Sequence, residues 1–92
     1  MLKLYMMLED KMFKHKTADG KRNICGEKIK TLRKNLPSKV SQRILAEKMQ
    51  LKGIDIDKSA IKCIENGTRY VTDIEIKAFC AIFSVSADYL LE

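Results

Sequence analysis

The stretch from Val40 to Gly67, on which the fold depends, reads VSQRILAEKMQLKGIDIDKSAIKCIENG. Two segments in it have helical periodicity, and a connector that contains Gly53 separates them. In the second segment, Ala60, Ile61 and Ile64 fall on one arc at ~100° per residue. The opposite arc carries Lys58, Ser59, Lys62 and Cys63. The stretch therefore predicts two helices, the second with an apolar face and a cationic, polar face.

The cationic arc has two interpretations. A helix anchored by isoleucines that presents lysine and serine from its first turns is typical of one that enters the major groove of DNA. Side chains on that arc would then read base edges, and these are Lys58, Ser59, Lys62 and Cys63. Periodicity alone fits a solvated amphipathic helix equally well.

Residue types at fixed positions relative to one another indicate a resemblance to a known family. Residues 41–46, SQRILA, followed by residues 59–67, SAIKCIENG, resemble the lambda-repressor-like, or XRE-type, helix-turn-helix family. Residues 29–34, IKTLRK, are similar to the first helix of that family. Its last two helices are matched by DIE at 73–75 and VSADYLL at 85–91.

The resemblance covers about residues 23–91 and implies an all-α fold, a five-helix DNA-binding domain. Residues 23–92 would form this helix-turn-helix domain, and residues 1–22 a flexible or partly helical N-terminal extension. The chain departs from the family between Met49 and Ile56, where six residues stand in place of the single glycine of most members. We therefore expect a longer connection, with an added turn of helix before Gly53. The side chains of Ile54 and Ile56 are expected to pack this connection against the core.

The function that the resemblance implies is sequence-specific binding of double-stranded DNA by a transcriptional repressor of prokaryotic or phage type. The free N–H groups at the start of the helix after Ser41 favour a phosphate. The expected phosphate contacts are Ser41, Gln42, Arg43, Asn66, Thr68 and Arg69. The resemblance also implies an ion pair between Arg33 and Glu65, both at the edges of apolar stripes.

Helix boundaries follow from capping signals. Asn23 is expected to cap a first helix over Ile24–Leu36, which Pro37 ends. Ser41 and Asp57 suit the caps of the next two helices. The sequence TDIE at 72–75 predicts a capping box that opens a fourth helix, and a short fifth helix is expected to start at residues 85–86.

Composition limits the alternatives. Ninety-two residues suffice for one small domain, and no run approaches the ~18 apolar residues of a membrane span. The net charge of +6 favours an anionic partner, but residues 1–39 hold 11 Lys/Arg against 4 Asp/Glu and residues 40–92 hold 7 against 8. If residues 40–92 bind DNA, they would therefore rely on a few lysine and arginine side chains at specific positions.

Neither a metal site nor a cofactor is expected. Cys25, Cys63 and Cys80 contain no C-x-x-C pair, and His15 is the only histidine, which argues against zinc and against a nucleophilic catalytic set. Enzymatic activity is therefore not expected. Reduced thiols in a cytoplasmic protein are expected, with Cys25 and Cys80 as small core residues.

Two expectations concern partners. A DNA regulator of this size is expected to be a homodimer on a pseudo-palindromic operator, because two recognition helices must reach major grooves one turn apart, at ~10–10.5 bp. The alternative function is an adaptor or antitoxin-like module, in which DNA binding is secondary or lost. Its protein partner would bind the segment Leu2–Phe13, which contains an apolar cluster with helical spacing.

Overall fold

Five α-helices and their connecting loops make up residues 19–92, the part of the chain that this computed structural model describes. The helices are α2 (Gly26–Lys34), α3 (Gln42–Leu51), α4 (Lys58–Glu65), α5 (Asp73–Phe83) and α6 (Ala87–Leu91). No strand occurs within these residues, so the expected all-α class and the five helices are confirmed. The segment Leu2–Phe13, expected to bind a protein partner, lies outside the described residues.

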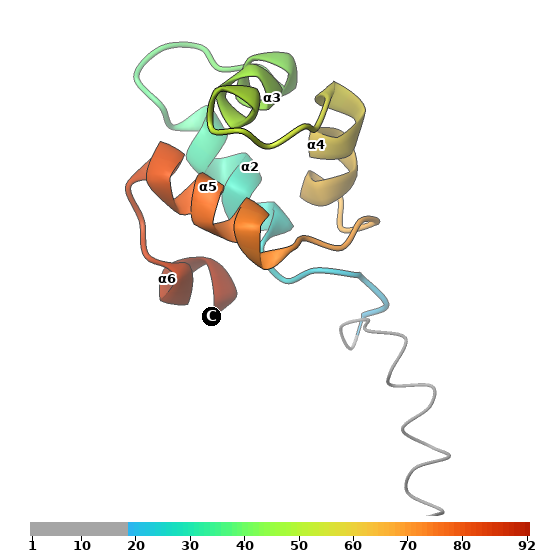
Figure 1. The fold of residues 1–92 in the computed structure, drawn as a ribbon. Helices are drawn as coiled ribbons and strands as arrows, with labels where there is room; N and C mark the ends of the chain where they lie inside the picture. The colour runs from blue at the N-terminus through green and yellow to red at the C-terminus, as the bar shows by residue number, and fades with distance from the viewer. Residues whose placement is uncertain (1–18) are drawn as a thin grey trace, which may run out of the picture.

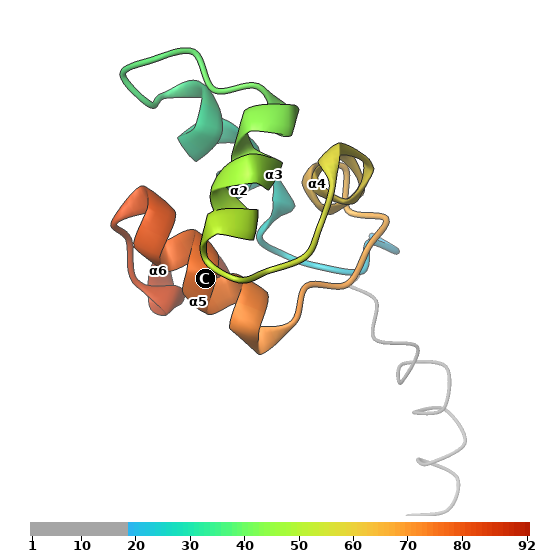
Figure 2. The ribbon, with the colours of Figure 1, turned by 45° about the horizontal axis from the view of Figure 1, so that its top comes forward.

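The helices are arranged around α5, which lies centrally and packs on α2, α3 and α6 (Figure 1). Helix α4 packs on α3 and α2 at one side of the domain. Figure 2 looks nearly along the axis of α4 and shows α3 running across the view, so the two helices cross at a steep angle. Helix α4 therefore stands at the edge of the domain with one side against its neighbours.

The core consists of the apolar stripes of all five helices. Ile29, Ile61 and Phe79 are fully buried, and burial of such a side chain stabilises the fold by about 1.5–3 kcal/mol. The other fully buried large side chains are Cys25, Leu45, Met49, Ile64 and Leu90. Burial raises the pKa of the Cys25 thiol, which suits the expected role as a core residue, whereas Cys80 is only partly buried.

Three predicted helix caps are confirmed. The Ser41 hydroxyl accepts a hydrogen bond from the Ile44 N–H at 3.1 Å, and Asp57 Oδ1 accepts one from the Ala60 N–H at 2.9 Å. The capping box at the start of α5 is complete, with the side chains of Thr72 and Glu75 each bonded to the other's backbone N–H. These side chains satisfy N–H groups that have no acceptor within their helices.

The first helix is shorter than expected, since it spans Gly26–Lys34 rather than Ile24–Leu36. Asn23 does accept a hydrogen bond from the Gly26 N–H at 2.8 Å, but Cys25 occupies the N-cap position. At the other end the Leu36 N–H bonds to the Arg33 carbonyl in a tight turn, because the residue before a proline avoids helical geometry.

The long connection between α3 and α4 is accommodated by a glycine cap. Gly53 has a φ of +86°, and the following Ile54 N–H bonds back to the Met49 carbonyl at 3.0 Å, which closes the end of α3. The Gln50 side chain donates to the Ile56 carbonyl at 2.9 Å. Ile56 is buried and Ile54 partly buried, so both side chains hold the connection on the core as expected.

The contact between α2 and α4 depends on Gly26. A Cβ atom at this position would overlap the carbonyl oxygen of Ile64 and lie 3.0 Å from that of Glu65. Both obstacles are backbone atoms of α4, so they cannot move aside as a side chain would. Gly26 therefore sets how closely the start of α2 approaches the end of α4.

We expect Gly26→Ala to lower the free energy of unfolding by about 1–3 kcal/mol, because the added methyl group must push the two helices apart. Urea denaturation followed by circular dichroism measures the change. Thr31→Ala, at an exposed position of the same helix, is the control and should stay within about 0.5 kcal/mol of the parent. Equal stabilities of the two variants would contradict this account of the contact.

Candidate nucleic-acid interface

The outer face of α4 carries the residues that the sequence predicts for base readout. Ile61 and Ile64 have no exposed surface, whereas Lys58, Ser59 and Lys62 are exposed. Lys58 and Lys62 are one turn apart, so their ammonium groups extend from the same side of the helix. Cys63 is partly buried at the margin of this face. The surface therefore presents two cations and a hydroxyl from a helix held rigidly by its other side.

A hollow of about 360 Å³ opens at the surface where the C-terminal half of α4 meets α2 and the start of α3. Three of its lining residues, Gln42, Lys62 and Asn66, were predicted to contact DNA. Lys21 and Lys30 also line it, together with Glu27 and Glu65, and sequence reasoning missed both lysines. The signal for Lys30 was available, because Glu27, Lys30 and Lys34 form the exposed stripe of α2 opposite the buried Ile29.

The hollow is supported by a buried ion pair, the one that the sequence predicts between Arg33 and Glu65. Arg33 Nε lies 2.7 Å from Glu65 Oε2, and Arg33 Nη2 lies 3.0 Å from Glu65 Oε1. Gln42 Nε2 donates to the same carboxylate at 3.0 Å, and Arg33 Nη1 donates to the Val40 carbonyl at 2.9 Å. Hydrogen bonding to Glu65 raises the pKa of Arg33 above its ordinary value despite burial. The pair joins α2, α3 and α4.

The N-terminal end of α3 carries cations on its other flank as well. Lys34, Lys39 and Ser41 line a second hollow of about 400 Å³. Arg43 is exposed in the first turn of α3 and makes a 3.1 Å surface ion pair with Glu47. Such a pair is weak in water and costs little to exchange for a phosphate. The start of α3 thus lies between two groups of lysines.

Two of the expected phosphate contacts, Asn66 and Thr68, are bonded to each other in the loop after α4. Asn66 Oδ1 accepts hydrogen bonds from the Thr68 N–H at 3.1 Å and from the Thr68 hydroxyl at 2.7 Å. The Thr68 hydroxyl hydrogen is therefore used inside the loop in this structure. The amide nitrogen of Asn66 remains the group of this pair that suits an anionic oxygen.

Arg69, one of the expected phosphate contacts, makes an ion pair within the domain. Arg69 Nη1 and Nη2 lie 2.9 Å and 3.0 Å from the two carboxylate oxygens of Glu75, a bidentate pair. Glu75 is buried, and the same residue forms the capping box of α5. Arg69 lies in the loop before α5 and Glu75 lies within α5, so no single helical or strand period relates them, and sequence reasoning could not find the pair.

The charge state of Glu75 follows from these contacts. Burial alone would raise the pKa of its carboxyl, but the hydrogen bonds from Arg69 and from the Thr72 backbone outweigh burial and hold the pKa below the ordinary value. Hydrogen bonding to Glu75 raises the pKa of Arg69. The two groups therefore remain ionised together, and the pair acts as a structural support for the loop between α4 and α5.

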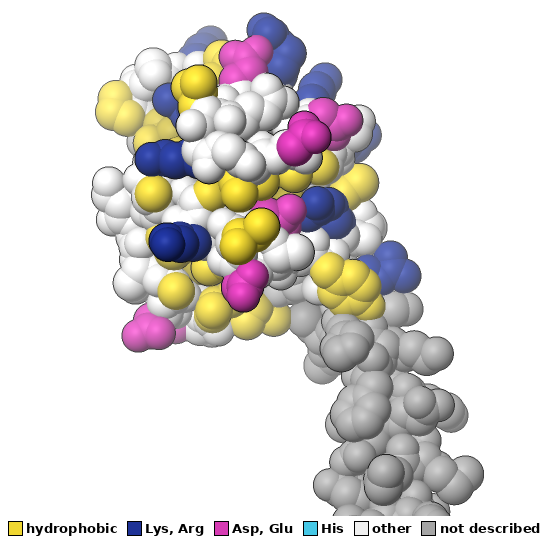
Figure 3. All heavy atoms as spheres, in the orientation of Figure 1, with side chains coloured by type: hydrophobic (Ala, Val, Ile, Leu, Met, Phe, Trp, Pro, Cys, Tyr) yellow, Lys and Arg dark blue, Asp and Glu magenta, His cyan; other side chains and the backbone are white. Residues whose placement is uncertain are grey.

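The face drawn in Figure 3 has a different character. Hydrophobic side chains gather over α5 and α6 on this face, with single charged side chains between them. Ile74 of α5 and Leu91 of α6 are exposed at 62% and 48%. By contrast, lysines line both hollows beside the start of α3.

Comparison with known proteins adds no family assignment, since no family model, curated protein or solved structure matches this chain. Residues 19–92 contain no cluster of His, Cys, Asp or Glu side chains that could hold a metal ion. Within the same range, no helix has the length and apolar character needed to cross a membrane.

We expect Arg33→Met or Glu65→Met to lower the free energy of unfolding by about 3–5 kcal/mol, because each leaves a buried charge without its partner. The double variant should cost less than the sum of the two, because both charges are then absent. Arg43→Met with Glu47→Met, at the exposed pair of α3, is the matched control and should change stability by less than about 1 kcal/mol. Additive losses at the buried pair would show that the two side chains are not coupled.

The pair between Arg69 and Glu75 should make stability depend on pH. Because the pKa of Glu75 is lower in the folded state, the stabilisation is complete above the unfolded value of about 4.3 and is lost as pH falls through the folded pKa. Arg69→Met should therefore be less stable than the parent at pH 7, and the difference should shrink below about pH 4. Urea titrations at several pH values measure it, with Arg43→Met as the control. A difference that stays constant down to pH 2 would contradict the assignment.

Proposed function

We propose that this chain is a sequence-specific binder of double-stranded DNA with the lambda-repressor-like helix-turn-helix fold, and acts as a transcriptional repressor of prokaryotic or phage type. The observation that carries the proposal is the division of α4 into a buried isoleucine side and an exposed side with Lys58, Ser59 and Lys62. A helix at the edge of a domain with this division suits insertion into a major groove.

In this arrangement the lysines of α4 meet base edges. A lysine ammonium pairs with guanine O6 and N7, and Ser59 pairs with several base edges. Cys63 is partly buried and is a weak donor, so its contribution to readout is small. Asp57 places a negative charge at the start of α4, but its carboxylate is bonded to the Ala60 N–H.

The phosphate contacts are proposed at the start of α3 and around the hollow beside it. Arg43 and Lys30 supply positive charge there, and the first N–H groups of α3 add the positive end of its dipole. Gln42 is held by Glu65, so its position is fixed before DNA arrives. Arg69 and Thr68 are assigned to the support of the loop rather than to phosphates.

A symmetric dimer follows from the size of α4. Eight residues of helix address only a few base pairs, and two-fold related helices would read half-sites one turn apart, at ~10–10.5 bp. A pseudo-palindromic operator is therefore the proposed partner, and the proposed setting is the cytoplasm.

The proposal is tested by titrating the purified chain into mixed genomic DNA fragments at moderate salt and sequencing the fragments retained. Enrichment of one recurrent inverted repeat supports a sequence-specific dimer. Retention without any enriched sequence would overturn specific readout and favour the adaptor or antitoxin-like alternative.

With a selected duplex in hand, Lys58→Ala or Lys62→Ala should lose about 1–3 kcal/mol of binding free energy and relax preference at one base pair. Arg43→Ala should instead weaken selected and random duplexes alike and lower the salt slope by about one unit. Binding measured across a salt series and a set of single-base variants separates these outcomes. Equal losses on every sequence for both lysine variants would make the lysines backbone contacts.

A further inference from the structure

We propose that the segment Lys21–Asn23, called the strap below, positions the C-terminal end of α4, and that Asn23 is its principal positioning residue. The consequence for recognition rests on the DNA binding proposed above. The effect on α4 itself does not depend on any ligand. Asn23 precedes its acceptor Ile64 by 41 positions in the sequence, and capping signals alone assign Asn23 only to the start of α2.

Asn23 makes three hydrogen bonds with its side chain. Nδ2 donates to the Ile64 carbonyl at 3.0 Å and to the Arg69 carbonyl at 2.8 Å, and Oδ1 accepts from the Gly26 N–H at 2.8 Å. An asparagine amide has two donor hydrogens, and both go to the segment that closes α4. One side chain thus joins the start of α2 to the last turn of α4 and to Arg69 in the loop after it.

Arg22 adds contacts to the middle of the same loop. Its backbone N–H bonds to the Gly67 carbonyl at 2.8 Å, and Nη1 donates to the Thr68 carbonyl at 3.1 Å. The guanidinium lies 5.7 Å from the centre of the Tyr70 ring. A cation near the C-terminal end of a helix also interacts favourably with its dipole.

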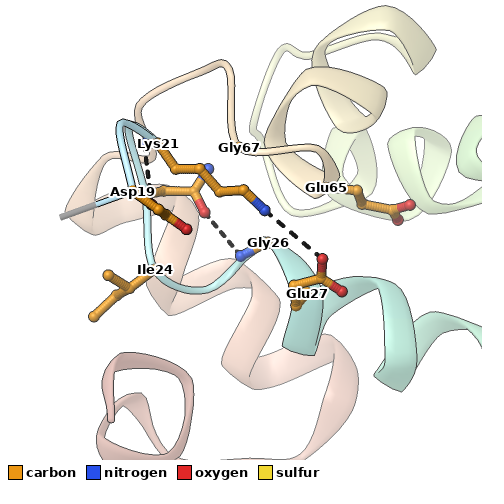
Figure 4. Close-up of a pocket in the computed structure, with 8 residues that line it drawn as sticks. Asp19, Lys21, Ile24, Gly26, Glu27, Glu65 and Gly67 are labelled. Atoms are coloured by element: carbon orange, nitrogen blue, oxygen red, sulfur yellow. Dashed lines mark hydrogen bonds and ion pairs between the residues drawn. The ribbon is translucent and has the colours of Figure 1, made fainter. Parts of the chain in front are cut away.

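Lys21 covers the glycine that ends α4. A Cβ atom at Gly67 would lie 2.7 Å from Lys21 Cδ, and Gly67 also has a φ of +83°. Figure 4 shows Lys21 extending beside Gly67 toward Glu27, with which it forms a 3.8 Å ion pair. The positive φ therefore calls for glycine at this turn, and the Lys21 side chain packs over it.

The strap matters because the last carbonyl groups of a helix have no partners within it. At the end of α4 and in its loop, carbonyl groups accept hydrogen bonds from Asn23 and Arg22, the two residues that lie shortly before α2. The end of α4 bears Lys62 and Asn66, which line the hollow beside α3. Without these donors, the last turn of α4 and the loop after it would keep the Arg33–Glu65 pair but lose their hydrogen bonds to the start of α2.

Asn23→Asp tests the role, because it keeps the oxygen that caps α2 and removes both donors to the α4 loop. Hydrogen exchange followed by NMR should show about tenfold faster exchange of the amides of Asn66, Gly67 and Thr68, whose acceptors are the carbonyls of residues 62–64. The amides of Leu45 in α3 and Val85 after α5 should change much less. Uniform acceleration of all amides, or none, would overturn the proposal.

Two further variants keep the test decisive. Asn35→Asp makes the same chemical change at an exposed residue after α2 and should leave the amides of residues 66–68 unaffected. Arg22→Ala removes only the guanidinium contacts and should accelerate the same amides by a smaller factor, which tests the strap even if Asn23→Asp does not fold.

A second measurement addresses recognition. The ratio of affinities for the selected and random duplexes should fall at least about fivefold in Asn23→Asp relative to Asn35→Asp, because displaced reading residues lose base contacts first. Local loosening with an unchanged ratio would overturn the positioning role while leaving DNA binding intact. If no duplex is selected, the proposed function fails, and the exchange experiment still decides whether the strap holds α4.

Discussion

The buried ion pair between Arg33 and Glu65 is the interaction on which the arrangement of this domain depends. It is bidentate, it receives a further hydrogen bond from Gln42, and it connects α2, α3 and α4. An apolar core permits small sliding movements, whereas a buried charge requires its partner in one geometry. The pair therefore fixes where α4 stands relative to α2 and to the start of α3.

Contacts of two other kinds converge on the same end of α4. Gly26 lets the start of α2 touch the backbone carbonyls of Ile64 and Glu65, and Asn23 donates to the Ile64 and Arg69 carbonyls. Beyond the loop, Arg69 is held by the buried Glu75. Internal hydrogen bonds thus occupy many polar groups of the loop after α4. The outer face of α4 and the start of α3, in contrast, carry exposed cations.

Positive charge is distributed differently along the sequence and on the folded surface. Residues 40–92 hold 7 Lys/Arg and 8 Asp/Glu, so no general excess of cations attracts DNA there. The structure brings Lys21 and Lys30 from the basic first half beside Gln42 and Lys62. Positive charge at the proposed interface is therefore assembled from distant parts of the sequence, and binding that depends on it should be sensitive to salt.

The sequence by itself determined the helices, most of their caps and the inward side chains, because periodicity and capping are local properties of the chain. It also indicated Arg33 with Glu65 through a resemblance. Tertiary structure alone decided that Gly26 is a packing contact, that Asn23 reaches α4, and that Arg69 pairs with Glu75. Each of these three contacts joins groups that folding brings together across the chain or around a loop. Local periodicity in the sequence does not show which groups will meet in this way.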